Sequence, residues 1–296
     1  MTTLSDITSV NGVCDTHVHV FEPDHYPYAQ GRAYTPGYAR CGDLEGLMSS
    51  LGVRRCVIVQ PSVYGRDNAC LLAALRHFGS DRARGVAVID HHTISTDELI
   101  GLREAGVRAV RVNFEATRSA VPIDRMSVIR ATARRAKEAR LAVQLFVDTA
   151  TAVDAAGELA EQGVTLILDH FAGFKCGMDI NSPIFTKLLK TLETGNVWVK
   201  LSAPYRTGSN LPTYEDLRPA AQAMIATAPE RMVWASDWPH TSGGQRDGKD
   251  PTRIEPFREI DDRSDLARLQ RWVGNDARYL KIVADNAAQL FDFPNT

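Results

Sequence analysis

The chain has 296 residues, of which 44% are hydrophobic, so it can bury a large core, and we expect a single domain over residues 1–296. Its 34 basic and 36 acidic residues leave a net charge of −2, so the chain lacks the excess of basic residues typical of proteins that bind nucleic acid or anionic membranes, and neither partner is expected. Five cysteines without CxxC spacing, no export signal and no apolar run of about 18 residues indicate a soluble cytoplasmic protein, whose oligomeric state stays open.

Short apolar runs rich in β-branched residues alternate with helical patterns along the chain, as is typical of a parallel α/β fold. The runs predict strands over residues 12–20, 55–60, 85–89, 108–113, 142–147, 165–170, 197–201 and 231–237. The patterns between them predict helices over residues 43–51, 67–78, 96–104, 123–140, 153–162, 183–194 and 214–228. Asp43 and Thr96 are the predicted N-cap residues of two of these helices. Eight strands in this alternation favour a closed (β/α)8 barrel, the TIM-barrel fold.

A polar stretch over residues 241–265 follows the eighth predicted strand and is expected to form a lid or a pocket wall. Two more helices, over residues 266–274 and 276–290, complete the chain.

Polar residues gather at the predicted carboxyl ends of the strands, which is where TIM barrels carry their chemistry. His17 and His19 end the first run, His170 ends the sixth and Asp237 ends the eighth. Because His17 and His19 are two residues apart on a strand, both side chains point to the same face, the barrel interior. If a divalent ion is bound, His17, His19 and Asp237 give it three protein ligands, enough for a catalytic zinc site.

This arrangement resembles the amidohydrolase superfamily, which carries HxH on strand 1, histidines on strands 5 and 6 and an aspartate on strand 8. The segments Asp-Thr-His-Val-His at 15–19, Val-Gln-Pro-Ser at 59–62, Arg-Val-Asn-Phe at 111–114 and Ser-Asp-Trp-Pro-His at 236–240 are similar to its lactonase branch. That branch contains 2-pyrone-4,6-dicarboxylate lactonases, 4-sulfomuconolactone hydrolases and galactarolactone isomerases. The resemblance implies an amidohydrolase-type barrel that opens a small anionic lactone in the catabolism of aromatic compounds.

One departure from the superfamily pattern concerns metal. The fifth run, residues 142–147, contains no histidine, and the fourth contains no lysine or glutamate that could bridge two ions, so a binuclear centre is not expected. The lactonase branch implies catalysis without an essential metal. A single zinc or manganese ion is the alternative.

In a mechanism without metal, Asp237 is expected to deprotonate a water molecule while His17, His19 and His170 polarise the lactone carbonyl. The resemblance assigns Arg111 and Arg206 to binding of substrate carboxylates, which suits the guanidinium fork. Further candidate substrate contacts lie in neighbouring loops: Ser62, Tyr64, Arg118 and His240.

Two positions depart from the carboxylate clamp of the dicarboxylate lactonases. Leu145 and Gly173 stand where that group has a tyrosine and an arginine. We therefore expect a substrate with one fewer carboxylate, or with a sulfonate.

Three other functions fit the same residues. A sugar-acid lactone isomerase and a metal-dependent decarboxylase of an aromatic acid would use the same fold. A barrel that binds a small anion without catalysis is the alternative from a different class, and the joint presence of His17, His19, His170 and Asp237 argues against it.

Overall fold

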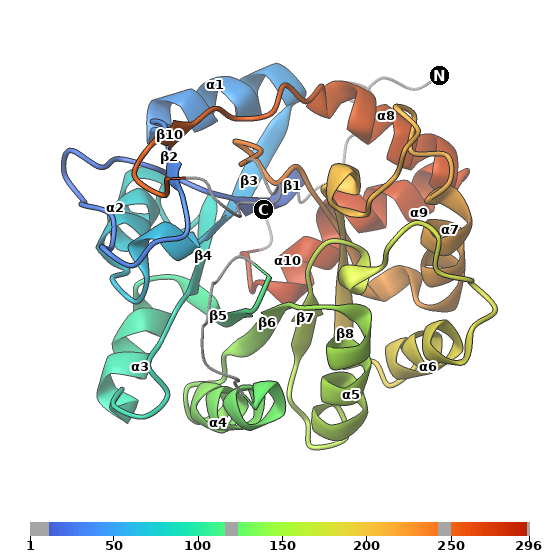
Figure 1. Cartoon of the computed structure of the whole chain (residues 1–296), viewed down its shortest axis with the longest axis horizontal. Coiled ribbons are helices and arrows are strands. Elements are labelled where there is room, and N and C mark those ends of the chain that lie inside the picture. Colours follow the sequence, from blue (N-terminus) through green and yellow to red (C-terminus); the bar gives the residue numbers. More distant parts are fainter. Residues whose placement is uncertain (1–11, 116–123, 242–249, 295–296) are drawn as a thin grey trace.

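The computed structural model describes residues 12–115, 124–241 and 250–294, and within them eight parallel strands follow one another around a barrel (Figure 1). The strands are β1 (Val13–Val18), β3 (Val53–Val59), β4 (Ala83–Ala87), β5 (Val107–Asn113), β6 (Ala142–Phe146), β7 (Leu166–Leu168), β8 (Val197–Ser202) and β9 (Met232–Ala235). Each predicted run overlaps one of them. The prediction of a TIM barrel is confirmed.

Helices surround the strands on the outside (Figure 1). They are α1 (Cys41–Leu51), α2 (Ala69–Phe78), α3 (Thr96–Glu104), α4 (Arg125–Glu138), α5 (Thr149–Leu159), α6 (Pro183–Leu192), α7 (Arg218–Thr227), α8 (Asp262–Val273), α9 (Asp276–Leu280) and α10 (Asn286–Leu290). A π-helical turn over Lys281–Asp285 joins α9 to α10, where one helix was predicted.

The predicted N-caps of α1 and α3 are wrong. Arg40 precedes α1, and Asp43 stands at the third helical position, where its carboxylate accepts from the Arg40 N–H at 2.8 Å. In α3 the cap is Ser95, whose hydroxyl accepts from the Glu98 N–H at 3.1 Å while the Glu98 carboxylate accepts from the Ser95 N–H at 2.7 Å. The start of α3 is a reciprocal capping box, whereas at α1 only the Asp43 carboxylate accepts, because the Arg40 side chain has no acceptor; in both helices the acidic residue stands inside the first turn rather than before it.

The barrel closes between β1 and β9. A parallel bridge joins Val18 to Trp238, the Asp237 N–H donates to the His17 carbonyl at 3.0 Å, and the His19 N–H donates to the Trp238 carbonyl at 2.9 Å. Closure therefore brings the histidines of the first strand directly beside the aspartate that follows the last strand.

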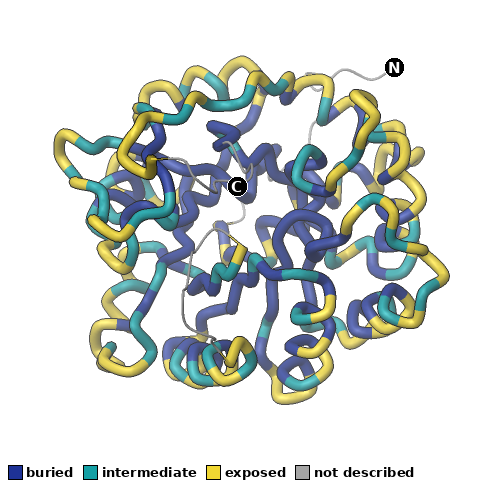
Figure 2. The backbone as a smooth tube through the Cα atoms, viewed as in Figure 1, coloured by how far each residue is buried: buried dark blue, intermediate teal, exposed yellow. Residues whose placement is uncertain are grey.

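The interior of the barrel is packed with side chains. An apolar layer that includes Val57, Ala109, Ile167 and Trp198 fills it, and residues of α10 and of the C-terminal segment, Phe291 among them, cover that layer. Figure 2 shows the buried backbone inside the ring and the exposed backbone on the outer helices. Because this layer and the C-terminal segment fill the bottom, the open end of the barrel is the one at the carboxyl ends of the strands.

Two loops form a wall beside the barrel mouth. The short strand β2 (Thr35–Pro36), which follows β1, pairs in parallel with β10 (Ile254–Glu255), which follows β9. Phe21 and Phe257 stack across the same loops with their ring centroids 6.1 Å apart. This part of the predicted lid or wall, residues 250–265, is thus tied to the barrel, whereas residues 242–249 lie outside the described chain.

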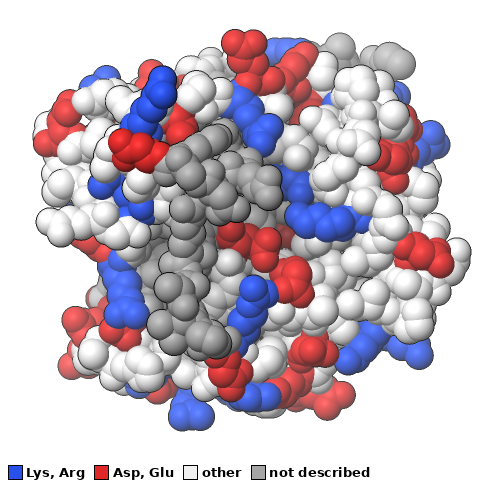
Figure 3. Space-filling model, viewed as in Figure 1, with Lys and Arg blue, Asp and Glu red and all other residues white. Residues whose placement is uncertain are grey.

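None of the helices in the described part of the chain has the length and apolar character needed to span a lipid bilayer. On the face drawn in Figure 3, basic and acidic side chains are interspersed.

Candidate active site

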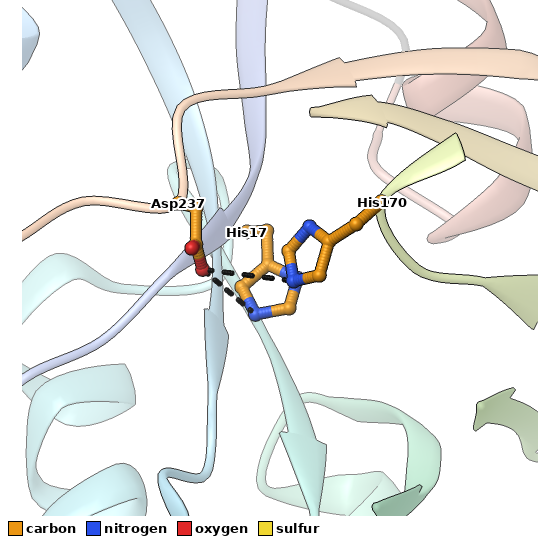
Figure 4. A group of neighbouring side chains, drawn as sticks. All are labelled: His17, His170 and Asp237. Atoms are coloured by element: carbon orange, nitrogen blue, oxygen red, sulfur yellow. Dashed lines mark ion pairs between the residues drawn. The ribbon is translucent and has the colours of Figure 1, made fainter. Parts of the chain in front are cut away.

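Three imidazoles surround one oxygen of Asp237. Asp237 Oδ1 lies 3.6 Å from His17 Nε2, 3.7 Å from His19 Nε2 and 3.9 Å from His170 Nε2. All four side chains are buried. Figure 4 shows the imidazoles of His17 and His170 turned toward the carboxylate of Asp237. The structure therefore brings together all four residues predicted to be catalytic.

The backbone turns sharply at two of these residues. His170 stands two residues after the end of β7 with φ 50°, and Asp237 stands two residues after the end of β9 with φ 67°. Positive φ is uncommon for residues with a side chain, and such conformations gather at functional sites, where the surrounding structure holds them in place. At both positions the backbone turns away from the strand, and the side chain of His170 or Asp237 lies in the barrel mouth.

The second oxygen of Asp237 is fully engaged. Oδ2 accepts hydrogen bonds from the Tyr205 hydroxyl and from Arg206 Nε, both at 2.7 Å. Burial alone would raise the pKa of Asp237, but Arg206 and the neighbouring imidazoles outweigh burial and hold the pKa well below its usual value. Asp237 is therefore an ionised carboxylate with one oxygen held and the other, Oδ1, facing the imidazoles.

Hydrogen bonds at Nδ1 orient two of the imidazoles that face Asp237. His19 Nδ1 donates to the Val59 carbonyl at 2.8 Å, which leaves a lone pair on Nε2. His170 Nδ1 lies 2.9 Å from the Ser202 hydroxyl oxygen. Burial lowers the pKa of His170 to about 3 against the opposing effect of Asp237, so this imidazole is neutral at physiological pH.

A second group of buried polar side chains lies behind His17, and we call it the Asp169 network. Lys200 Nζ donates to Gln144 Oε1 at 2.8 Å and lies 3.5 Å from Asp169 Oδ1. Asp169 Oδ2 accepts from Gln144 Nε2 at 3.0 Å and from an Arg111 terminal nitrogen at 3.3 Å. Burial would raise the pKa of Asp169, but Lys200, His17 and Arg111 together hold it well below its usual value.

His17 connects the two groups. Its Nδ1 lies 3.3 Å from Lys200 Nζ, a donor, and 3.3 Å from Asp169 Oδ1, an acceptor. If Lys200 donates, Nε2 carries the hydrogen and can polarise a carbonyl; if Asp169 accepts, Nε2 offers a lone pair. His17 Nε2 is buried without a hydrogen-bond partner in either case.

Sequence reasoning gave no role to Asp169, Gln144, Lys200 or Tyr205. A signal for the first three was present: each is polar within an otherwise apolar strand run, at an alternate position that points to the barrel interior. Tyr205 gave no such signal, because it lies in a short 3-10 turn, Pro204–Arg206, whose direction depends on the folded loop.

The donor set fits a divalent cation. One ligand atom each from His17, His170 and Asp237 all lie within 4.8 Å of one another. For His19 and His170, Nδ1 is occupied by a carbonyl and a hydroxyl, the arrangement that orients metal-binding imidazoles. The predicted set of His17, His19 and Asp237 also lies together, with both nitrogens under 4 Å from Asp237 Oδ1.

The predicted substrate cations Arg111 and Arg206 are both at the site, and each already faces a carboxylate. Arg206 is held by Asp237 at 2.7 Å and also donates to the Thr241 hydroxyl at 3.2 Å. Arg111 lies 3.3 Å from Asp169. Substrate would therefore have to share these guanidinium groups with the protein.

The remaining predicted contacts fall in different places. His240 is buried and its Nε2 lies 3.1 Å from Asp262 Oδ2. The Tyr64 hydroxyl accepts from the Glu22 N–H at 2.9 Å, and Ser62 is half-buried at the start of the same 3-10 turn. Arg118 lies outside the described residues.

Comparison with known proteins places the chain in a family. The family model for amidohydrolases matches residues 14–293, so the chain belongs to the amidohydrolase family. The expected resemblance to its lactonase branch and the prediction of a hydrolase are both confirmed.

Three characterised relatives show the range of that branch. The chain is 32% identical to 4-sulfomuconolactone hydrolase from Rhizobium radiobacter, over 95% of this chain and 90% of the relative. It is 32% identical to 2-pyrone-4,6-dicarboxylate hydrolase from Comamonas testosteroni, over 77% of each. It is 29% identical to D-galactarolactone isomerase from Agrobacterium fabrum, over 95% of this chain and 91% of the relative.

Proposed function

We propose that this chain hydrolyses a small anionic lactone, carboxylated or sulfonated, in the breakdown of aromatic compounds. The observation that carries the proposal is the position of Asp237 Oδ1, which faces three imidazoles at the mouth of the barrel. The similarity to two lactone hydrolases and one lactone isomerase supports a lactone as the substrate.

Asp237 is the general base. Its Oδ2 is fixed by Tyr205 and Arg206, so Oδ1 is the oxygen that accepts a proton from the attacking water. The lone pair of His19 Nε2 beside Oδ1 is a second acceptor that orients the same water. Attack of the water oxygen on the lactone carbonyl then gives a tetrahedral oxyanion, which collapses with cleavage of the ring C–O bond as the proton held by Asp237 passes to the departing ring oxygen.

The developing oxyanion needs hydrogen-bond donors or positive charge. His17 supplies a donor when Lys200 donates to its Nδ1, because the hydrogen then resides on Nε2. This assigns His17 to the carbonyl, His19 to the water, and His170 to either, since the Ser202 hydroxyl can donate to its Nδ1 or accept from it.

A divalent ion is not essential to this scheme. If zinc or manganese binds, His17, His170 and Asp237, with His19 beside them, are the residues that would hold it, and the ion would supply Lewis-acid polarisation of the carbonyl. The roles of Tyr205, Arg206 and the Asp169 network in holding these side chains are the same in both cases.

The test is a panel of lactones followed at several pH values, with and without chelator, on protein whose metal content is measured. Hydrolysis of 2-pyrone-4,6-dicarboxylate or 4-sulfomuconolactone that survives chelation supports the proposal. Isomerisation of a sugar-acid lactone without ring opening points to the isomerase alternative, and CO₂ release from an aromatic acid points to the decarboxylase. Failure to open any lactone contradicts the proposal.

A further inference from the structure

One guanidinium beside the site has no role in the scheme above. The Arg258 guanidinium carbon lies 5.2 Å from the ring centroid of Tyr205, the residue whose hydroxyl donates to Asp237. The backbone of Arg258 is tied to the loop after β9, because the Arg258 N–H donates to the His240 carbonyl at 2.9 Å. Arg258 therefore lies beside the same tyrosine that donates a hydrogen bond to Asp237.

Arg258 differs from the other two arginines of the site in its partners. Arg206 pairs with Asp237 and Arg111 pairs with Asp169, whereas Arg258 pairs with no carboxylate in the chain as described. Its Nε, like that of Arg111, is buried and has no hydrogen-bond acceptor, so the lack of a carboxylate partner is what sets Arg258 apart. A buried donor without an acceptor is costly, so this nitrogen is expected to find its acceptor in a ligand.

Three acidic residues that follow Arg258 in the sequence have partners of their own. Asp262 Oδ2 lies 3.1 Å from His240 Nε2, Asp261 caps α8 by accepting from the Ser264 N–H at 3.1 Å, and Asp265 pairs with Arg268 at 2.5 Å. These three carboxylates are therefore already engaged, and none of them forms an ion pair with Arg258 in the described chain.

Two guanidinium groups share the ring of Tyr205. The Arg206 carbon lies 5.3 Å from the ring centroid and the Arg258 carbon 5.2 Å, but Asp237 compensates the charge of Arg206 alone. Both positive charges act on the surroundings of this ring, and an anion bound beside it would be attracted by the uncompensated charge of Arg258. The fork of an arginine also matches two oxygens of a carboxylate or sulfonate.

We propose that Arg258 binds the acidic substituent of the lactone and so determines the preference for anionic substrates. This inference rests on the proposed function and deepens it, because it names the group that recognises the carboxylate or sulfonate. Arg206 and Arg111 remain with Asp237 and Asp169 and hold the catalytic side chains.

The experiment compares an anionic lactone, 2-pyrone-4,6-dicarboxylate or 4-sulfomuconolactone, with a neutral lactone such as dihydrocoumarin. Arg258→Gln is expected to lower kcat/KM for the anionic lactone by roughly 10- to 100-fold, mainly through KM, and to change the neutral lactone by less than about 3-fold. Arg258→Lys keeps the charge but loses the fork, so an intermediate loss is expected. The matched control is Arg134→Gln on the outer helix α4, an exposed arginine whose loss is expected to leave both substrates unaffected.

Thermal unfolding of each variant shows whether it is folded, and Arg258→Lys keeps the test available if Arg258→Gln is not. An equal loss on anionic and neutral lactones, or no loss on either, overturns the role of Arg258 while leaving lactone hydrolysis intact. If the wild-type enzyme opens no lactone at all, the proposed function fails first, and that failure is visible before any variant is measured.

Discussion

Two groups of buried polar side chains meet at His17, and they differ in how tightly the side chains around each carboxylate's Oδ1 are packed. In the Asp169 network the oxygens and nitrogens lie 2.8 to 3.5 Å apart. Around Asp237 Oδ1 the three nitrogens lie 3.6 to 3.9 Å away, beyond normal hydrogen-bond distance. The first group holds itself together, whereas the second leaves room for a ligand. Structural and chemical roles are thus divided between neighbouring carboxylates.

The largest effect on activity is expected in the group around Asp237. Asp237→Asn keeps the shape of the side chain and removes the base, so kcat/KM for an anionic lactone should fall by roughly 10²- to 10⁴-fold. Steady-state kinetics measure the loss, and thermal unfolding confirms that the variant is folded. Turnover equal to wild type would remove Asp237 from the mechanism.

Breaking the Asp169 network should act on stability instead. Lys200→Met leaves the buried charge of Asp169 with less compensation, and we expect the free energy of unfolding to fall by about 3–5 kcal/mol, measured with urea. The control is Lys187→Met, an exposed lysine 3.3 Å from Asp154, which should cost less than about 1 kcal/mol. Equal losses in the two variants would show that the network does not stabilise the barrel.

Asp15, which lies beside the two groups, is expected to make the stability of the fold depend on pH. Its Oδ1 accepts from the backbone N–H groups of His17 and Ser236, at 3.2 and 3.0 Å, and burial raises its pKa to about 7. A carboxyl whose pKa is raised by folding stabilises the fold fully below its ordinary pKa, and this contribution is lost as the pH rises through the folded value.

We therefore expect wild type to lose stability relative to Asp15→Asn between pH 4 and pH 8, by up to about 4 kcal/mol. Urea unfolding of both proteins across this range measures the difference in stability. The contribution of His170 cancels in this difference because both proteins contain it. A difference that does not change with pH would mean that Asp15 is ionised in the folded protein.

The smallest effect is expected from Tyr205→Phe. Asp237 Oδ2 loses one of its two donors but keeps Arg206, so kcat/KM should fall by about 10-fold. Tyr38→Phe is the matched control, because its hydroxyl donates to Asp24 at 2.7 Å on the exposed surface. If the two variants have equal activity, the Tyr205 hydroxyl does not position the base.

Much of the site could be predicted from the sequence because strands alternate their side chains. His17, Arg111 and Asp237 were found as polar residues at the carboxyl ends of apolar runs, and the structure places them at the barrel mouth. The same rule marks Lys200, which is fully buried in β8, as a polar residue of a strand end. It received no role because a single lysine in a sequence gives no sign of its partners.

The sequence by itself determined the barrel, the order of its strands and the residues that line its mouth, since all of these follow from local alternation and chain order. Only the tertiary structure decided which charges neutralise one another. Arg206 and Arg111 look like free substrate-binding groups in the sequence, yet they face Asp237 and Asp169, while Arg258 lies over Tyr205 without a carboxylate among the residues described. The physical reason is that ion pairing depends on distances of a few ångströms between strands that are far apart in the chain.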